Sequence, residues 1–256
     1  VQEILIGALR REEPAARKDT GVQFEGGVLV AEDTPASQKL MKLMLERLGF
    51  SVDLAADGKQ TLEMYRKNSY RLVFMDINMP VYDGVEAARR ILAYEKKEGL
   101  AHVPIIALTA KAVKGDRERF LSEGMDEYLS KPVTREALLK VVRAFIKKEK
   151  SSGAGPAEKK NQENECETTA AAVALGIDQG AYLGLVRDFL DDSAAYLGIL
   201  EKAVVDKDMK QIELGSHRIK GAASNYNFTN LAEAACSMEN AAAGNEMEFD
   251  YAAVYG

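Results

Sequence analysis

The sequence predicts two domains of different class: an α/β domain built on a parallel sheet, followed by an all-α helical bundle. From Val28 onward, short apolar runs alternate with amphipathic helical segments, a pattern typical of a parallel sheet covered by helices. After about residue 170 no strand pattern recurs, and alanine, leucine and charged residues repeat at helical spacing. The charged, small-residue stretch between the two parts has no periodicity and is typical of a linker.

In the first domain the expected strands are short and apolar, and the expected helices are amphipathic. The strands are Val28 to Ala31, Val52 to Ala55, Leu72 to Met75, Ile105 to Leu108 and Glu127 to Leu129. The helices are Ser37 to Leu48, Gly58 to Lys67, Gly84 to Glu98, Ala112 to Ser122 and Thr134 to Lys147. Because the two kinds of element alternate, we expect right-handed crossovers between parallel strands.

In the second domain three helical stretches predict an antiparallel bundle: Gln179 to Val205, Met209 to Ala223 and Thr229 to Ala242. Since the chain stops at Gly256, where a final helix would begin, we expect a truncated bundle unless a partner completes it. The predicted domains are residues 1–26 for an upstream helix tail and linker, 27–148 for the α/β domain, 149–170 for a flexible linker and 171–256 for the bundle.

Composition describes a soluble globular protein, with 46% hydrophobic and 29% charged residues among 256. The net charge of −6 argues against a nucleic-acid partner, which would require a clustered basic face. No stretch reaches the roughly 18 apolar residues that a membrane span needs, so we expect a cytoplasmic location without membrane contact. The chain begins at Val1 rather than Met, which suggests a piece of a longer protein such as a membrane sensor.

Chemically active side chains follow four of the expected strands. They are Glu32 and Asp33 after the first strand, Asp76 after the third, Thr109 after the fourth and Lys131 after the fifth. A single carboxylate at a strand end could equally cap a turn or a helix. Because the carboxyl ends of parallel strands meet at one edge of the sheet, however, we expect these five side chains to form one site.

The chemistry of this set is specific. Three carboxylates that lie close together stay ionised most easily around a hard divalent cation, which favours Mg²⁺. Lys131 would add a second positive charge, and the hydroxyl of Thr109 could donate a hydrogen bond to an anionic oxygen. The set therefore predicts a site for a phosphoryl group, with one carboxylate left as nucleophile. His102 lies in the loop before the fourth strand, and we expect it to be solvated.

These motifs, in this order, resemble the receiver domain of two-component response regulators over roughly Gly27 to Lys148. The motifs are Glu32-Asp33, Asp76 with Met79-Pro80 and Asp83-Gly84, Thr109-Ala110, and Lys131-Pro132. The resemblance implies a flavodoxin-like fold with a doubly wound, five-stranded parallel sheet. It also implies that Asp76 accepts a phosphoryl group from a phosphohistidine.

The resemblance assigns a role to each of the other residues. Mg²⁺ would be held by Glu32, Asp33, Asp76 and the backbone carbonyl of Asn78. Lys131 would pair with the phosphoryl oxygens, Thr109 would move toward them, and Tyr128 would be the aromatic rotamer switch.

A second candidate site lies in the predicted bundle. On a helix His217, Lys220, Gly221 and Ser224 share one face, so we expect His217 to be exposed beside a lysine and over a glycine. A glycine inside a helix costs about 1 kcal/mol relative to alanine, which suggests that something approaches the backbone closely there. Arg218 and Lys220 form a positive island in a domain with six Lys or Arg and fourteen Asp or Glu from Cys166 onward. The plain alternative is a surface histidine with incidental basic neighbours.

This segment is similar to the histidine-containing phosphotransfer (HPt) domain, whose motif reads His, any residue, Leu or Ile, Lys, Gly. The similarity covers about Leu175 to Gly256. It implies that His217 carries the phosphoryl group, that Lys220 gives electrostatic support and that Gly221 leaves room for an incoming receiver. Asn227 departs from the glycine that these domains usually have after the active helix.

Together the two resemblances predict a phosphorelay protein, such as the carboxyl-terminal part of a hybrid sensor histidine kinase. The expected partners are an upstream sensor histidine kinase and a downstream receiver or HPt protein. Since the sequence has no glycine-rich ATP-binding segment, we do not expect this chain to be a kinase by itself. Two alternatives remain: the helical domain is only an output or dimerisation module, or the acidic cluster belongs to a Mg²⁺-dependent phosphatase.

Overall fold

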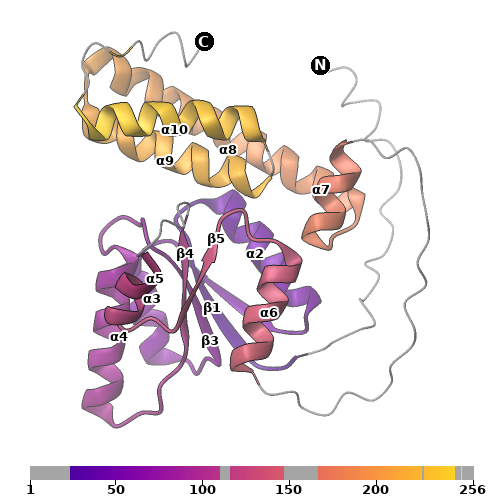
Figure 1. Cartoon of the computed structure of the whole chain (residues 1–256), viewed down its shortest axis with the longest axis vertical. Helices are drawn as coiled ribbons and strands as arrows, with labels where there is room; N and C mark the ends of the chain where they lie inside the picture. Colours follow the sequence, from indigo (N-terminus) through magenta and orange to yellow (C-terminus); the bar gives the residue numbers. More distant parts are fainter. Residues whose placement is uncertain (1–23, 110–115, 147–166, 227, 246–248, 250–256) are drawn as a thin grey trace.

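The computed structural model describes residues 24–109, 116–146, 167–226, 228–245 and 249. Figure 1 shows a sheet domain with helices on both faces and, above it, a group of long helices that includes α8, α9 and α10. The expected upstream helix tail, most of the expected linker and the last residues of the expected bundle lie outside the described residues.

The sheet has five parallel strands, as the sequence predicted, and their order is β2-β1-β3-β4-β5. The strands are β1 (Gly27–Ala31), β2 (Ser51–Ala55), β3 (Leu72–Asp76), β4 (Ile105–Thr109) and β5 (Glu127–Ser130). Every residue of β3 and β4 is buried, because these apolar central strands are covered by helices on both faces.

Five helices surround the sheet: α2 (Pro35–Arg47), α3 (Gly58–Lys67), α4 (Gly84–Glu98), α5 (Asp116–Ser122) and α6 (Arg135–Phe145). Core residues of α2 and α6 pack on one face of the sheet, and those of α3, α4 and α5 pack on the other, which confirms the doubly wound arrangement. Side chains of Asp57, Asp83 and Thr134 accept a hydrogen bond from the first turn of α3, α4 and α6 and so fix where these helices begin.

The sheet domain begins before Gly27, the first residue that the sequence analysis assigned to it. The ring of Phe24 stacks on that of Phe50 with 5.3 Å between centroids, and its N–H donates to the carbonyl oxygen of Leu48 at 2.7 Å. The prediction of a linker up to residue 26 is therefore wrong at its end, because one aromatic residue inside a polar segment joins the core.

The helical domain contains α7 (Glu167–Leu175), α8 (Gln179–Asp206), α9 (Met209–Asn225) and α10 (Thr229–Ala243). The three predicted helices are confirmed to within two residues at each end. Helix α7 was not predicted, and its residues 167–170 were assigned to the linker. This alanine-rich run has no polar stripe opposite an apolar one, so helical periodicity could not reveal it.

The two domains are packed against each other. Phe189 of α8 and Tyr226 at the end of α9 belong to the same buried cluster as Leu40 of α2. In Figure 1, α9 accordingly lies next to α2, above the sheet domain. A search of the described helices finds none that combines the length and the apolar character needed to cross a membrane.

Candidate functional site

The three predicted carboxylates come together at the ends of β1 and β3. One oxygen from each of Glu32, Asp33 and Asp76 lies within 4.8 Å of the others. Nζ of Lys131, just after β5, lies 2.7 Å from Oε2 of Glu32 and 2.7 Å from Oδ2 of Asp76. The parallel strands thus bring to one edge residues that are up to 99 positions apart in the sequence.

Burial and the neighbouring charges together set the pKa values of Glu32 and Lys131. Burial raises the pKa of Glu32 to about 7, although the neighbouring Lys131 acts in the opposite direction. Burial alone would lower the pKa of Lys131, but Asp76 and Glu32 outweigh it and hold this pKa well above its usual value. Lys131 is therefore charged, whereas the carboxyl group of Glu32, with a pKa of about 7, is only partly ionised near neutral pH. A donor set of three carboxylates fits a hard divalent cation such as Mg²⁺.

The loop after Asp76 is held against the strand end by Gly84. The N–H of Gly84 donates to the carbonyl oxygen of Ile77 at 2.8 Å, and a Cβ atom added at Gly84 would overlap the carbonyl oxygen of Asp76. The N–H of the exposed Asn78 donates to Oδ1 of Asp76 at 3.2 Å. In the sequence, Asp83-Gly84 served only as one of the receiver motifs; the structure shows that Gly84 allows α4 to begin directly against the Asp76 backbone.

The two predicted switch residues lie on β4 and β5. Thr109 is buried at the end of β4, and its carbonyl oxygen accepts a hydrogen bond from the N–H of Lys131 at 2.7 Å. Tyr128 is half-buried and packs against the core cluster that contains Met79 and Val85. The switching roles of Thr109 and Tyr128 stay predictions.

His217 does not lie on an open surface. It is 8% exposed, and its Nδ1 atom lies 2.8 Å from Oε1 of Glu239 on α10. Nζ of Lys220 donates to the other carboxylate oxygen of Glu239. The expectations of an exposed histidine and of a positive island are both wrong, because Lys220 is paired with Glu239 and Arg218 with Asp33.

The carboxylate of Glu239 determines which nitrogen of His217 carries a proton. Burial would raise the pKa of Glu239, but hydrogen bonds from His217 and Lys220 outweigh it and lower this pKa below its usual value. Since an ionised carboxylate only accepts hydrogen bonds, Nδ1 of His217 must donate, and Nε2 of the neutral ring keeps its lone pair. Sequence reasoning missed Glu239. A carboxylate between the buried residues Met238 and Ala241 was the signal that could have found it.

Helix α9 brings the two candidate sites together. Nε of Arg218 donates to Oδ2 of Asp33 at 2.8 Å. A methyl group added at Gly221, one turn after His217, would lie 3.9 Å from Nζ of Lys131. At the end of the helix, the hydroxyl of Tyr226 donates to the carbonyl oxygen of Ala36 at 3.0 Å. The histidine helix therefore covers the acidic cluster.

Comparison with known families agrees with the division of the chain into a sheet domain and a helical domain. Residues 28–143 match the family model described as response regulator receiver domain, and residues 184–254 match that of the Hpt domain. The chain is a receiver followed by an HPt domain. Both resemblances drawn from the sequence are thereby confirmed.

The relatives of this receiver and HPt pair include much longer proteins. Hybrid signal transduction histidine kinase I of Dictyostelium discoideum is 43% identical over 137 residues, which are 49% of this chain and 8% of that protein. Aerobic respiration control sensor protein ArcB of Escherichia coli K12 is 32% identical over 213 residues, which are 80% of this chain and 26% of that protein. This chain thus spans about a quarter or less of each of these two relatives.

Among solved structures, one similar to this chain is the receiver domain of sensor histidine kinase PA1611 from Pseudomonas aeruginosa PAO1, crystallised with a magnesium ion in its active site cleft. The two sequences are 40% identical in a match that covers 48% of this chain and 98% of the solved one, with a TM-score of 0.43.

His102 of the receiver lies in the loop after α4 and is held by two carboxylates. Nδ1 lies 2.8 Å from Oε2 of Glu95, and Nε2 lies 3.0 Å from Oδ2 of Asp126. Burial alone would lower the pKa of His102, but these two partners raise it above its usual value. His102 is exposed in a loop, as expected from the sequence, and its ring also links α4 to the segment before β5.

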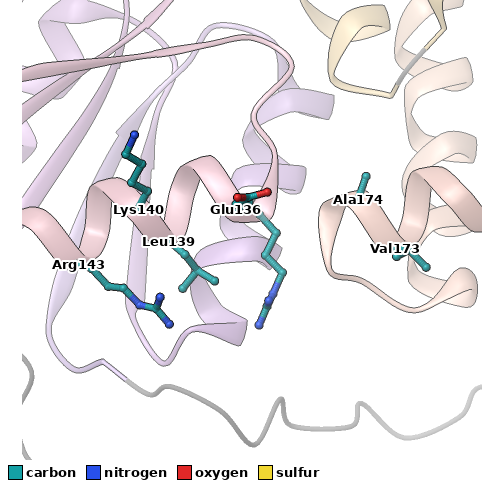
Figure 2. A pocket seen from close by; sticks show the side chains of 7 residues that line it. Glu136, Leu139, Lys140, Arg143, Val173 and Ala174 are labelled. Carbon is teal, nitrogen blue, oxygen red and sulfur yellow. The ribbon is translucent and has the colours of Figure 1, made fainter. Parts of the chain in front are cut away.

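A cavity of about 580 Å³ lies between α6 of the receiver and α7 (Figure 2). Its lining comprises Arg135, Glu136, Leu139, Lys140, Arg143, Val173 and Ala174. None of the predicted site residues is among them.

Proposed function

We propose that this chain is a phosphorelay protein in which Asp76 of the receiver and His217 of the HPt domain exchange a phosphoryl group. One observation carries the proposal: the helix that bears His217 is docked on the receiver site, with Arg218 bound to Asp33 and Gly221 beside Lys131. An HPt domain that served only for output or dimerisation would not need its histidine helix at this place.

The receiver residues would work as follows. A carboxylate oxygen of Asp76 forms a bond to phosphorus while the bond from phosphorus to the histidine nitrogen of the donor breaks, and that nitrogen recovers its electron pair. Lys131, already bound to Asp76, would move its hydrogen bond to a phosphoryl oxygen. Thr109 would donate to another phosphoryl oxygen, and Tyr128 would follow that movement.

Glu32, Asp33 and Asp76, with the backbone carbonyl of Asn78, would hold Mg²⁺. The donor set supports this assignment, because three carboxylate oxygens gather within 4.8 Å. When bound, the cation would supply the positive charge that the phosphoryl oxygens need in the transition state.

In the HPt domain, Glu239 would position His217. By accepting the Nδ1–H bond it leaves Nε2 as the nucleophile, and it would stabilise the positive charge that the ring gains on phosphorylation. Lys220 would support the phosphoryl group, and in this structure it also holds Glu239 in place. Gly221 would keep the helix surface flat where it faces Lys131.

The wider setting follows from the two domain families. An upstream sensor histidine kinase would phosphorylate Asp76, and a downstream receiver or HPt protein would take the group onward. We propose a cytoplasmic location and no direct contact with membrane or nucleic acid for this part of the protein.

The stability of a phosphoryl label tests the proposal. The full chain would be incubated with a small acyl phosphate and Mg²⁺, beside its Asp76→Asn and His217→Gln variants. Label that survives acid but not base is expected on Asp76, and label that survives base but not acid is expected on His217. Label that persists unchanged in both variants, or steady phosphate release from unrelated phosphoesters, would contradict the relay and favour a phosphatase.

A further inference from the structure

The ion pair between Arg218 and Asp33 joins the HPt domain to one of the three clustered carboxylates. The side chains are 24% and 3% exposed, so the pair is largely shielded from water. The guanidinium of Arg218 also lies over the ring of Tyr196, 5.9 Å from its centroid, which holds the side chain in this direction. Asp33 therefore faces a cation that comes from the other domain.

Both carboxylate oxygens of Asp33 have partners in this arrangement. Oδ2 accepts from Arg218, and Oδ1 accepts from the hydroxyl of Thr34 at 3.2 Å. A divalent cation bound by Glu32, Asp33 and Asp76 would need an oxygen of Asp33 and would bring two positive charges close to the guanidinium. Because like charges repel strongly where water is excluded, the cation and Arg218 compete for the same carboxylate.

We propose that Arg218 is a latch that a divalent cation displaces: it holds the HPt helix tightly over the receiver site when the cation is absent, and when the cation binds, the helix is held only by its other contacts, so that it can open and return. The inference deepens the proposed function, on which it rests, by naming a regulation of the same site. Since coupling between two binding events is reciprocal, docking of the HPt domain must weaken cation binding by the factor by which the cation weakens docking.

Two further contacts between the domains lie away from the acidic cluster. Lys39 pairs with Asp188 at 3.0 Å, and the amide of Asn225 donates to the hydroxyl of Ser37 at 2.9 Å. Loss of the Arg218 contact would therefore loosen the part of α9 over the site, while α8 and the end of α9 stay attached to α2. With the cation bound, the site can thus open to an external phosphohistidine, and α9 can still return to it for transfer to His217, because the remaining contacts keep the HPt domain attached.

Calorimetric titration of the full chain with MgCl₂ tests the latch, and it requires no phosphoryl donor. Arg218→Ala is expected to bind Mg²⁺ about tenfold more tightly than the unmodified chain, because a charge-assisted hydrogen bond no longer competes. Lys210→Ala removes an equal charge from an exposed position on the same helix, and its Mg²⁺ affinity is expected to stay within about twofold. Arg218→Gln serves as a second variant if Arg218→Ala does not fold.

Hydrogen exchange provides the reciprocal measurement. In the unmodified chain Mg²⁺ is expected to speed exchange in residues 218–222, whereas in Arg218→Ala exchange there is fast with or without Mg²⁺. Two results would overturn the latch. One is an equal Mg²⁺ affinity of the Arg218 and Lys210 variants, and the other is hydrogen exchange in the unmodified chain that does not change when Mg²⁺ is added. Neither outcome bears on the proposed phosphorelay, which the phosphoryl-label experiment tests separately.

Discussion

Nδ1 of His217 lies 2.8 Å from Oε1 of Glu239, so a carboxylate of α10 orients the proposed phosphoryl carrier on α9. Glu239→Ala should slow charging of His217 by about tenfold or more, because nothing then selects the tautomer with a free Nε2. It should also destabilise the fold by about 1–3 kcal/mol, since the buried Lys220 loses its partner. Glu239→Gln keeps an oxygen that can accept from Nδ1–H and should recover most of the rate. The rate of transfer from a phosphorylated receiver checks this, and full-speed charging of Glu239→Ala would refute the positioning role.

The space around Gly221 should tolerate a small side chain but not a large one. A methyl group there would lie 3.9 Å from Nζ of Lys131, an ordinary contact, so Gly221→Ala should keep the domains docked and stabilise α9 by up to about 1 kcal/mol. Gly221→Leu places further atoms toward Lys131 and should push α9 away from the receiver, with loss of transfer between Asp76 and His217. Small-angle scattering and the transfer rate are the measurements. Gly198→Leu, at a glycine of α8 with open space around it, is the matched control.

Gly84 allows no side chain, because an added Cβ would overlap the carbonyl oxygen of Asp76. Gly84→Ala should therefore destabilise the receiver by about 1–3 kcal/mol and slow phosphorylation of Asp76, although alanine favours a helix. Gly184→Ala on α8, where nothing lies within 4 Å, should instead be neutral or stabilising. Urea unfolding of the two variants compares them, and equal stability would argue against this close approach.

His102 should make stability depend on pH. Because Glu95 and Asp126 raise its pKa in the folded protein above the usual 6.5, its stabilising contribution is fully present below about pH 6.5. That contribution is lost as pH rises through the folded pKa. The stability difference between the unmodified chain and His102→Gln should thus be larger at pH 6 than at pH 9. Thermal unfolding at both values measures it, and a pH-independent difference would show that the charged ring contributes nothing.

The receiver fold and its acidic cluster could be predicted because their signals are local. The buried strand β3, for example, is the continuous apolar run Leu72–Met75 followed directly by Asp76 of the cluster. The docking of the HPt domain could not be predicted, since Arg218 and Asp33 are 185 positions apart and no periodicity relates them. The burial of His217 was missed for the same reason, because it depends on a partner from another helix. Asn227, the departure noted in the sequence, lies outside the described residues.

The hydrophobic cluster that Tyr226 and Phe189 share with Leu40 has a consequence for outside partners. Since both surfaces belong to one chain, each meets the other at an effective concentration that is typically in the millimolar range. A separate receiver at micromolar concentration must displace this resident neighbour before it can touch His217. Affinities measured with the whole chain should therefore fall well below those for an HPt domain freed from its receiver.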